Sequence, residues 1–345
     1  MTDATTDGSK RPNVSIKDVA AAAGVSIATV SRVVNNPSLV APSTAERVQA
    51  AVKQLGYRPN LFAKGLMTKR SRVLAVSLPD WQGDAYSELM RGADDRAREL
   101  GYHLLVSTEV HNKLMDSGEQ TSFALDLADG LIAMMTRSEA RDAEAIGRLN
   151  KPVVLLGATV SEYAVDTLEV DNAAGAREAT RHLLDGTRAD RCFFVGGPEG
   201  SFDSDRRAGA FRDVVEATGH RIHEDQVNRG RFSFQWGWDW AGKALSSHGL
   251  AQAAVFAGND EIAIGIMQRA REAGLECPRD LRLVGFDDSR TAGLLTPPLS
   301  SVRVPNRQIG AESVDVLVRR LSDSSAPVSH TSLPTQLVMR ESSWY

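Results

Sequence analysis

The stretch from Ile27 to Asn36 carries residues whose types and spacing suit contact with the edges of DNA bases. At helical spacing, one face presents small and polar side chains beside a single long cation: Ala28, Thr29, Arg32 and Asn36. Such a face fits the DNA major groove, where side chains can form hydrogen bonds with base edges. The opposite face is apolar and is expected to be buried; it holds Val30, Val33 and Val34.

A shorter helix is predicted just before this stretch. Ser15 and Asp18 form an S-x-x-D start signal in which the serine oxygen is expected to accept a backbone amide. Gly24 then supplies the permissive backbone of a tight turn, and Ser26 is placed to cap the second helix. Two short helices joined in this way are typical of a helix-turn-helix, and the same spacing also fits an ordinary helical hairpin. The apolar stripe of the first helix consists of Ile16, Val19, Ala20 and Ala23.

A third helix is predicted to complete the bundle, and the charge of this region suits phosphate binding. Pro42 followed by Ser43–Glu46 predicts a capping box, and Gly56 is expected to end the helix. Residues 1–72 hold 11 Lys or Arg against 4 Asp or Glu, whereas the remaining residues hold 29 against 40. A basic head on an acidic body favours nucleic-acid binding, although such an excess can also serve solvation alone.

From residue 73 onward, apolar runs of strand length alternate with amphipathic stretches of helix length. Near-continuous apolar strands separated by helices predict parallel sheets covered on both faces. Two such series, each about one domain long, predict an α/β body of two parallel-sheet subdomains. The predicted strands are 73–78, 103–108, 130–135 and 152–157 in the first series and 192–197, 253–258 and 281–286 in the second, followed by a helix at about 305–321 and a strand at 333–339.

Polar clusters follow several of these strands and are candidates for a ligand site. In open parallel sheets, ligands bind beyond the carboxyl ends of the strands, so the clusters are expected to converge on a cleft between the subdomains. Phe232 or Trp236 offers an apolar face for a sugar ring. Simpler roles are also open: Asn259 and Asp260 can cap a helix, Asp287 can start a turn, and the tryptophans can be packing residues. The clusters are Pro79-Asp80-Trp81-Gln82, Gly157-Ala158, Gly197 with residues 201–206, Gly258-Asn259-Asp260 and Phe286-Asp287-Asp288.

Other features of the sequence argue against several classes of protein. No apolar run approaches the ~18–20 residues needed to span a bilayer, and the polar start lacks the apolar core of a signal peptide, so a cytoplasmic protein is predicted. Cys192 and Cys277 lack metal-ligand spacing and are expected to be buried free thiols. The GGPEG segment at 196–200 is neither a dinucleotide fingerprint nor a Walker loop, and no hydrolase elbow or metalloprotease motif occurs. Neither an enzyme nor a cofactor is therefore predicted.

Residues 14–60 resemble the DNA-binding head of the LacI/GalR family of bacterial transcriptional regulators nearly position by position, and the similarity continues through the body. The resemblance implies that the second helix reads base edges through Ile27, Ala28, Thr29 and Arg32. It also implies nearby contacts with phosphates or bases from Ser26, Ser31, Asn35, Tyr57 and Asn60. Phosphate contacts would position the protein, and base-edge contacts would set its sequence preference.

The same resemblance assigns residues 61–72 to a hinge that forms a helix on operator DNA and pairs across a dimer. Leu66 matches the leucine that this family inserts into the central minor groove, and a plain linker leucine is the alternative. Gly65 stands where the family has a residue that tolerates a helix better. Folding of this hinge is therefore expected to depend strongly on DNA.

For the body, the resemblance implies an effector site that contains Arg206, three residues before a helical glycine, together with Asn259 and Asp287. An arginine and an aspartate can grip vicinal hydroxyls or a carboxylate through charge-assisted hydrogen bonds. The chain departs from the family at residues 83–86, where Gly-Asp-Ala-Tyr replaces Asn-Pro and two phenylalanines, which argues against an ordinary hexose. The predicted effector contacts are Asp80, Trp81, Tyr86, Gly157, Arg206, Phe232, Asn259 and Asp287.

Together these features predict a homodimeric transcriptional regulator, most simply a repressor, that binds a near-palindromic operator on the nucleoid and responds to a sugar or sugar-like effector. A sugar-binding protein of the transport type is the alternative for the body alone, but it would lack its secretion signal and leave residues 15–60 unexplained. The predicted boundaries are 1–12 for a disordered arm, 13–60 for the helix-turn-helix domain, 61–72 for the hinge and 73–345 for the body, with subdomains at about 73–170 plus 305–330 and about 171–304 plus 331–345.

Overall fold

The chain forms two compact units, the head at Met1–Ser71 and the body at Arg72–Tyr345. The computed structural model describes residues 14–57, 70–79, 84–108, 123–136, 146, 149–157, 164–247 and 249–344. The predictions made for the arm and for most of the hinge, including Gly65 and Leu66, therefore lie outside the described residues.

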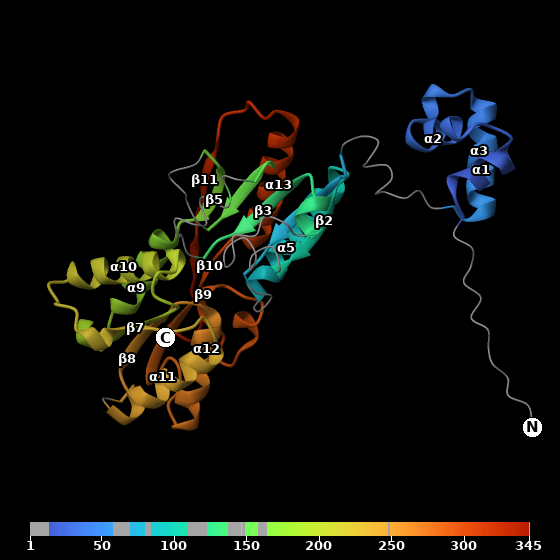
Figure 1. The fold of residues 1–345 in the computed structure, drawn as a ribbon. Helices are drawn as coiled ribbons and strands as arrows, with labels where there is room; N and C mark the ends of the chain where they lie inside the picture. The colour runs from blue at the N-terminus through green and yellow to red at the C-terminus, as the bar shows by residue number, and fades with distance from the viewer. Residues whose placement is uncertain are drawn as a thin grey trace, which may run out of the picture. The chain divides into compact units, whose positions relative to one another are not determined.

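The head is a three-helix bundle around a small apolar core (Figure 1). Its helices are α1 (Ile16–Ala23), α2 (Ile27–Asn35) and α3 (Pro42–Leu55), with a 3-10 turn, η1 (Pro37–Leu39), after α2. Val19, Val30 and Val48, one from each helix, are fully buried together. Gly24 ends α1 in the left-handed conformation, with φ at 64°, which glycine adopts without strain. The helix-turn-helix connection predicted from the sequence is therefore present.

The predicted start of α1 is confirmed, whereas that of α3 is not. At α1, the Asp18 carboxylate accepts hydrogen bonds from both the backbone N–H and the hydroxyl of Ser15, at 2.8 and 2.7 Å. The Ser15 side chain also faces the Asp18 N–H, so the predicted capping box is present, and the bonds to the carboxylate lower the pKa of Asp18. The predicted capping box at Ser43–Glu46 is wrong, because α3 begins earlier, at Pro42, whose fixed φ already suits the first helical position.

The body consists of two lobes, each built on a six-stranded sheet (Figure 1). The strand order is β11-β5-β4-β3-β1-β2 in the first lobe and β12-β10-β9-β8-β6-β7 in the second. Neighbouring strands are parallel, apart from the antiparallel pair β10 and β12. The first lobe contains β1 (Val73–Ser77), β2 (His103–Ser107), β3 (Gly130–Met134), β4 (Val153–Leu156), β5 (Asp166–Val170) and β11 (His330–Leu333). The second contains β6 (Cys192–Gly196), β7 (Val227–Arg229), β8 (Ala253–Ala257), β9 (Leu281–Asp287), β10 (Ser300–Arg303) and β12 (Gln336–Val338).

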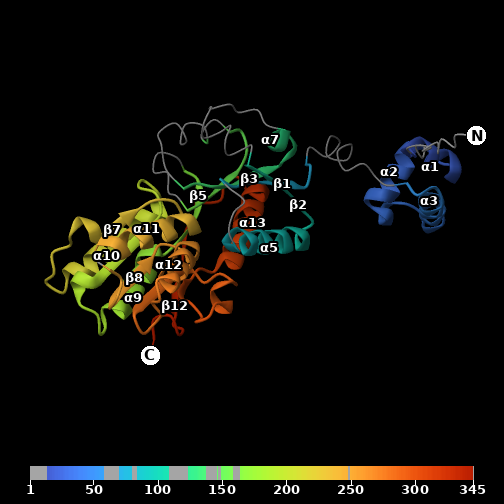
Figure 2. The same ribbon diagram turned by 90° about the horizontal axis from the view of Figure 1, so that it is seen from below.

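Helices cover both faces of each sheet, as expected for parallel strands. In the first lobe, α5 (Asp84–Glu99) and α13 (Asn306–Ser322) lie side by side, which is visible in both Figure 1 and Figure 2. Leu74 of β1 contributes to the core beneath this helix pair, and Ala75 contributes to the opposite core, which includes α7 (Phe123–Leu127). In the second lobe, α9 (Asn172–Leu184) and α10 (Phe202–Glu216) share one core, and α11 (Phe234–Ser247) and α12 (Asp260–Glu272) share the other.

The predicted fold class is confirmed, but the sheets also contain strands that the apolar pattern did not reveal. β5 reads DTLEV and β10 reads SSVR, so neither has the continuous apolar run on which the prediction depended. β11 spans the predicted subdomain boundary at residues 330 and 331, and it pairs with β5. Residues 331–333 therefore belong to the first lobe and not to the second, and the predicted strand at 333–339 is observed as the shorter β12.

Candidate functional site

The exposed face of α2 is the candidate DNA-reading surface of the head. Ile27 is 45% exposed, Ala28 and Arg32 are also exposed, and Thr29 is half-buried. Ser26 caps the helix: its Oγ accepts a hydrogen bond from the Thr29 N–H at 3.1 Å and lies 2.9 Å from Thr29 Oγ1. No described residue holds the Arg32 guanidinium in a hydrogen bond or ion pair, so it can reach a base edge or a phosphate.

The remaining predicted DNA contacts lie in different surroundings. Ser31 is half-buried on α2, and Asn35 is the last residue of that helix, although its side chain is outside the described part of the structure. Tyr57 is half-buried and packs against the core of the head, so its ring also stabilises the bundle. Asn60 and Leu66 lie outside the described residues, and their roles stay predictions.

A cleft of about 870 Å³ lies between the two lobes of the body. Strands of both sheets end at it, because Gly157 follows β4, Asn259 follows β8 and Asp287 ends β9. Five of the predicted effector contacts line this cleft: Tyr86, Gly157, Phe232, Asn259 and Asp287. Two further predicted contacts, Asp80 and Trp81, lie outside the described residues.

Arg206 does not line the cleft, and its predicted position there is wrong. It is half-exposed on α10, and its guanidinium pairs with Glu169 of the first lobe at 2.7 Å. The next residue, Arg207, lines the cleft instead and is only 5% exposed. The buried face of α10 has helical spacing, so the arginine four residues before the buried Phe211 points inward. The predicted position three residues before Gly209 therefore lies on the outer face of α10, next to the arginine that lines the cleft.

Arg207 is held in place by residues of the second lobe. Its Nε donates a hydrogen bond to Asn172 Oδ1 at 2.7 Å, and its Nη1 donates to the carbonyl of Gly258 at 2.6 Å. The guanidinium carbon lies 3.6 Å from the centroid of the Phe286 ring, a close cation–π contact. Asn172 in turn donates to Asp203 Oδ1 at 2.8 Å. The sequence did not identify Asn172, because a single polar residue in the first turn of a helix has no pattern that reveals its inward direction.

Asp287 combines an unusual backbone with a carboxyl group that receives no hydrogen bond within the described part of the chain. Its φ is 109°, a region that favours glycine and that other residues occupy only where the surrounding structure imposes it. No described residue donates a hydrogen bond to its side chain. Burial raises the pKa of this carboxyl to about 8; the nearby carboxylate of Asp260 acts in the same direction, and Arg207 opposes it. Asp287 is therefore ionised above about pH 8, and donors of a bound ligand, by bonding to the carboxylate, would favour its ionised form at lower pH.

The neighbouring pair Asn259 and Asp260 has a structural role as well. Asn259 Oδ1 accepts a hydrogen bond from the Ile262 N–H at 3.0 Å and so caps α12, as the simpler interpretation of the sequence expected. Asp260 is buried and accepts hydrogen bonds from the Ser301 hydroxyl at 2.5 Å and from the Ser289 N–H at 2.7 Å. Burial raises its pKa to about 6. The turn between β8 and α12 therefore both caps α12 and lines the cleft.

Comparison with known proteins identifies the family to which this architecture belongs. Residues 15–60 match the family described as bacterial regulatory proteins, lacI family, and residues 180–343 match a periplasmic binding protein-like domain. The chain is 30% identical over 330 residues to catabolite control protein A of Priestia megaterium, which covers 96% of this chain and 99% of that protein. The chain belongs to the LacI family.

Two further LacI-family comparisons agree with this assignment. The ribose operon repressor of Escherichia coli strain K12 is 30% identical over 329 residues, covering 95% of this chain and 99% of that protein. The solved structure of the lac repressor dimer bound to operator and the anti-inducer ONPF has a TM-score of 0.83 and 27% identity, and covers 96% of this chain and 99% of that chain. The chain is therefore a DNA-binding transcriptional regulator, and its relatives are regulators rather than enzymes. The alternative of a transport-type binding protein is not supported.

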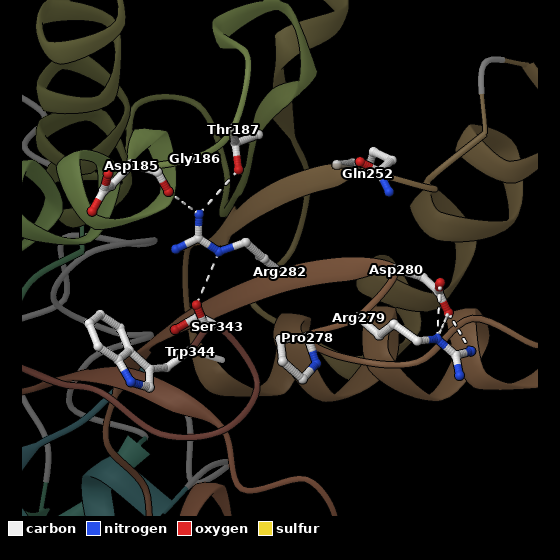
Figure 3. A pocket seen from close by; sticks show the side chains of 11 residues that line it. Asp185, Gly186, Thr187, Gln252, Pro278, Arg279, Asp280, Arg282, Ser343 and Trp344 are labelled. Atoms are coloured by element: carbon white, nitrogen blue, oxygen red, sulfur yellow. Dashed lines mark hydrogen bonds and ion pairs between the residues drawn. The ribbon is translucent and has the colours of Figure 1, made fainter.

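In this LacI-family chain, a second, smaller pocket is lined by residues that stabilise the fold. It measures about 290 Å³ and lies beside the amino-terminal ends of β8 and β9, whereas the effector cleft lies at their carboxyl ends (Figure 3). The Arg282 guanidinium donates to the carbonyls of His182 and Leu183 at the end of α9, and its Nε donates to the Ser343 carbonyl at 3.0 Å. Its donors thus cap the helix and hold the carboxyl-terminal segment, as Figure 3 shows for Ser343.

Two classes of site find no support in the part of the chain that the structure describes. No described helix has both the length and the apolar character to cross a membrane. Among the same residues, no cluster of three or more His, Cys, Asp or Glu side chains could hold a metal ion. Burial raises the pKa of the Cys192 thiol to about 12, as expected for an unreactive packing residue.

Proposed function

We propose that this LacI-family regulator is a homodimeric repressor whose affinity for a near-palindromic operator is controlled by a sugar or sugar-like molecule in the cleft. The observation that carries the proposal is that a fixed Arg207 and Asp287, whose side chain receives no hydrogen bond from a described residue, line the same interlobe cleft. A fixed cation and an accepting carboxylate suit recognition of vicinal hydroxyls. The lac repressor complex, with operator and anti-inducer, supports both kinds of partner.

The proposed control acts through the segment between the head and the body. Residues 13–60 act as the DNA-binding domain, and residues 61–72 form a hinge helix when paired on DNA, with Leu66 as a minor-groove wedge. Such a wedge is least costly at a flexible pyrimidine–purine step, so the operator has such a step, CG in our proposal, at its centre. The effector changes the relative position of the lobes, and in this way it changes the spacing of the paired hinges. The protein acts in the cytoplasm, on the nucleoid.

Arg32 tests the DNA-reading part of this function. Arg32→Ala should lose about 1–3 kcal/mol of preference for the operator over random DNA, because Arg32 is the one long cation on the exposed face of α2. Mobility shifts of operator and random fragments at two salt concentrations measure this preference. Arg47→Ala, which removes an equal charge from an exposed position of α3, should weaken both fragments alike. An unchanged preference in Arg32→Ala would refute the assignment.

A further inference from the structure

The effector cleft has a strongly acidic lining. Among the described residues that line it, five carry a carboxylate and two carry a guanidinium, and none is a lysine or a histidine. The two arginines differ in their freedom, because Arg207 is fixed by Asn172 and Gly258, whereas Arg231 is exposed. The acidic residues are Asp84, Asp203, Asp260, Glu261 and Asp287.

These carboxylates come from both lobes, so a ligand in the cleft is exposed to their combined field. Asp84 begins α5 in the first lobe and accepts a hydrogen bond from the Thr291 hydroxyl of the second lobe at 3.1 Å. Asp203 and Glu261 lie in the first turns of α10 and α12. A partly enclosed site strengthens electrostatic interactions relative to water, so each of these charges acts on a bound molecule more strongly than it would at an open surface.

Asp287 favours ligands that donate hydrogen bonds over ligands that carry negative charge. Its carboxylate has no donor among the described residues, and it faces the same cleft as four other carboxyl groups. A ligand with hydroxyl or amine donors satisfies it, whereas a phosphate or carboxylate brings only further acceptors and negative charge. Apolar side chains, including Tyr86, Phe232 and Ile264, complete the lining and suit the face of a ring.

We propose that the effector of this regulator carries no negative charge, and that the cleft selects polyhydroxylated or amine-bearing molecules and rejects their phosphorylated or carboxylated counterparts. This inference rests on the proposed function, because it specifies the class of ligand that enters the proposed effector cleft. Asp287 is the specificity-determining residue, since it is the acceptor that a donor-rich ligand satisfies. The other four carboxyl groups make the electrostatic potential in the cleft negative, which disfavours an anionic ligand.

The test does not require the effector to be known in advance. A polar-metabolite extract of the bacterium that encodes the chain is passed over a strong anion-exchange resin, which separates a flow-through of neutral and cationic molecules from a retained anionic fraction. The full-length protein is then tested with each fraction for a change in melting temperature and for a change in retention of operator DNA. The expected result is that the flow-through changes both properties and that the retained fraction changes neither.

The outcomes separate this inference from the proposed function. If the retained fraction produces the response, the protein has an effector but the charge assignment is overturned. If neither fraction acts on a protein that binds its operator, the effector-responsive function itself fails, and the charge assignment fails with it. Neutral glucose, glucosamine and glucose 6-phosphate serve as a defined set in the same assay, in which stronger binding of the phosphate than of the two others would also overturn the proposal.

A variant tests the acceptor directly. Assayed above about pH 8, where the Asp287 carboxyl is ionised, Asp287→Asn should raise the amount of flow-through needed for half of the response about tenfold or more, because the amide oxygen accepts a neutral hydrogen bond in place of a charge-assisted one. Asp213→Asn, which neutralises a carboxylate on α10 that does not line the cleft, is the matched control and should respond like the parent. An unchanged response in Asp287→Asn would show that this carboxylate does not receive the ligand, and would overturn its assigned role.

Discussion

At the residue scale, the contrast between Arg206 and Arg207 shows how one position on a helix decides a function. The two arginines are adjacent, but they point about 100° apart around α10, so only Arg207 reaches the cleft. Arg206 instead joins α10 to Glu169 on β5, a link between the lobes. The two side chains therefore have separable effects, one on the ligand and one on the relative position of the lobes.

This contrast predicts different phenotypes for two neighbouring substitutions. Arg207→Ala should abolish the response of operator binding to effector, because it removes the fixed cation of the cleft. Arg206→Ala should retain effector binding within a few-fold, because an exposed ion pair contributes only about 0–1 kcal/mol. Isothermal titration with the active metabolite fraction, together with the melting temperature of each variant, measures both effects. Equal losses in the two variants would contradict the placement of these side chains.

The carboxyl groups of Asp287 and Asp260 also make the stability of the body depend on pH. Their pKa values in the folded chain, about 8 and about 6, lie above their ordinary value near 3.8. At pH values between about 4 and about 8, the folded protein therefore holds more protons than the unfolded chain. Its free energy of unfolding should fall as the pH rises through this range. Urea unfolding across this range should show a shallower fall in Asp287→Asn. A parent protein whose stability rises steadily across this range, with the same slope in the variant, would argue against this pKa shift.

At the element scale, the contact between α5 and α13 depends on glycines. A Cβ atom added at Gly310 would lie 1.9 Å from the carbonyl oxygen of Leu89, and one added at Gly92 would lie 1.9 Å from that of Arg307. Both obstacles are backbone atoms, so the helices would have to separate to admit a methyl group. This close approach fixes how α13, which follows the second lobe in sequence, packs against the first lobe.

Gly310→Ala should therefore lower the free energy of unfolding by about 1–3 kcal/mol, the usual cost of overpacking. Gly209→Ala is the matched control, because the same added atom on α10 meets nothing within 4 Å. That substitution should leave stability unchanged or raise it by up to about 1 kcal/mol through helix propensity. Chemical denaturation of both variants provides the comparison, and a stable Gly310→Ala protein would show that α5 and α13 can separate at little cost.

The same scale shows why some elements were predictable and others were not. The strands that cross the middle of each sheet, such as β3 and β8, are apolar along their whole length because both faces are covered, and their sequences reveal them. β10 was missed because Ser300 and Ser301 are buried as hydrogen-bonded residues, which a hydrophobic pattern cannot anticipate. The cleft residues at strand ends were predictable because the carboxyl ends of parallel strands meet at one edge of a sheet. Asn172 and Arg207 lie on helices, and the sequence does not show that their side chains point inward.

At the scale of the whole molecule, the chain passes between the lobes three times within residues 164–344. The passages follow β5, β10 and β11, and each of them is short. Short connections of this kind can act as hinges between the lobes, and a hinge rotation is the motion that the proposed control requires. The fully buried members of each core come from one lobe, so such a rotation would rearrange only peripheral contacts, such as that of Phe202 with the core around α7 and those of Val304 with a core in each lobe.

The proposed coupling predicts a specific pattern of amide exchange over residues 60–68. A short helix that contains Gly65 should be unstable alone, so these amides should exchange rapidly in the free dimer and slowly on the operator. Adding the active metabolite fraction to the operator complex should return the exchange toward that of the free protein if the ligand releases DNA. Slow exchange in the free dimer would rule out folding of the hinge on DNA, whatever the binding constants are.

The pairing of β11 with β5 and of β12 with β10 has a consequence for the order in which this protein is made. One edge strand of each sheet lies within residues 330–338, and the buried Ser342 and Ser343 bond to strands and to Arg282 of the second lobe. Neither lobe is complete until these residues have left the ribosome. The described three-helix bundle of the head ends at Tyr57, so during synthesis the part that reads DNA can fold long before the part that regulates it exists.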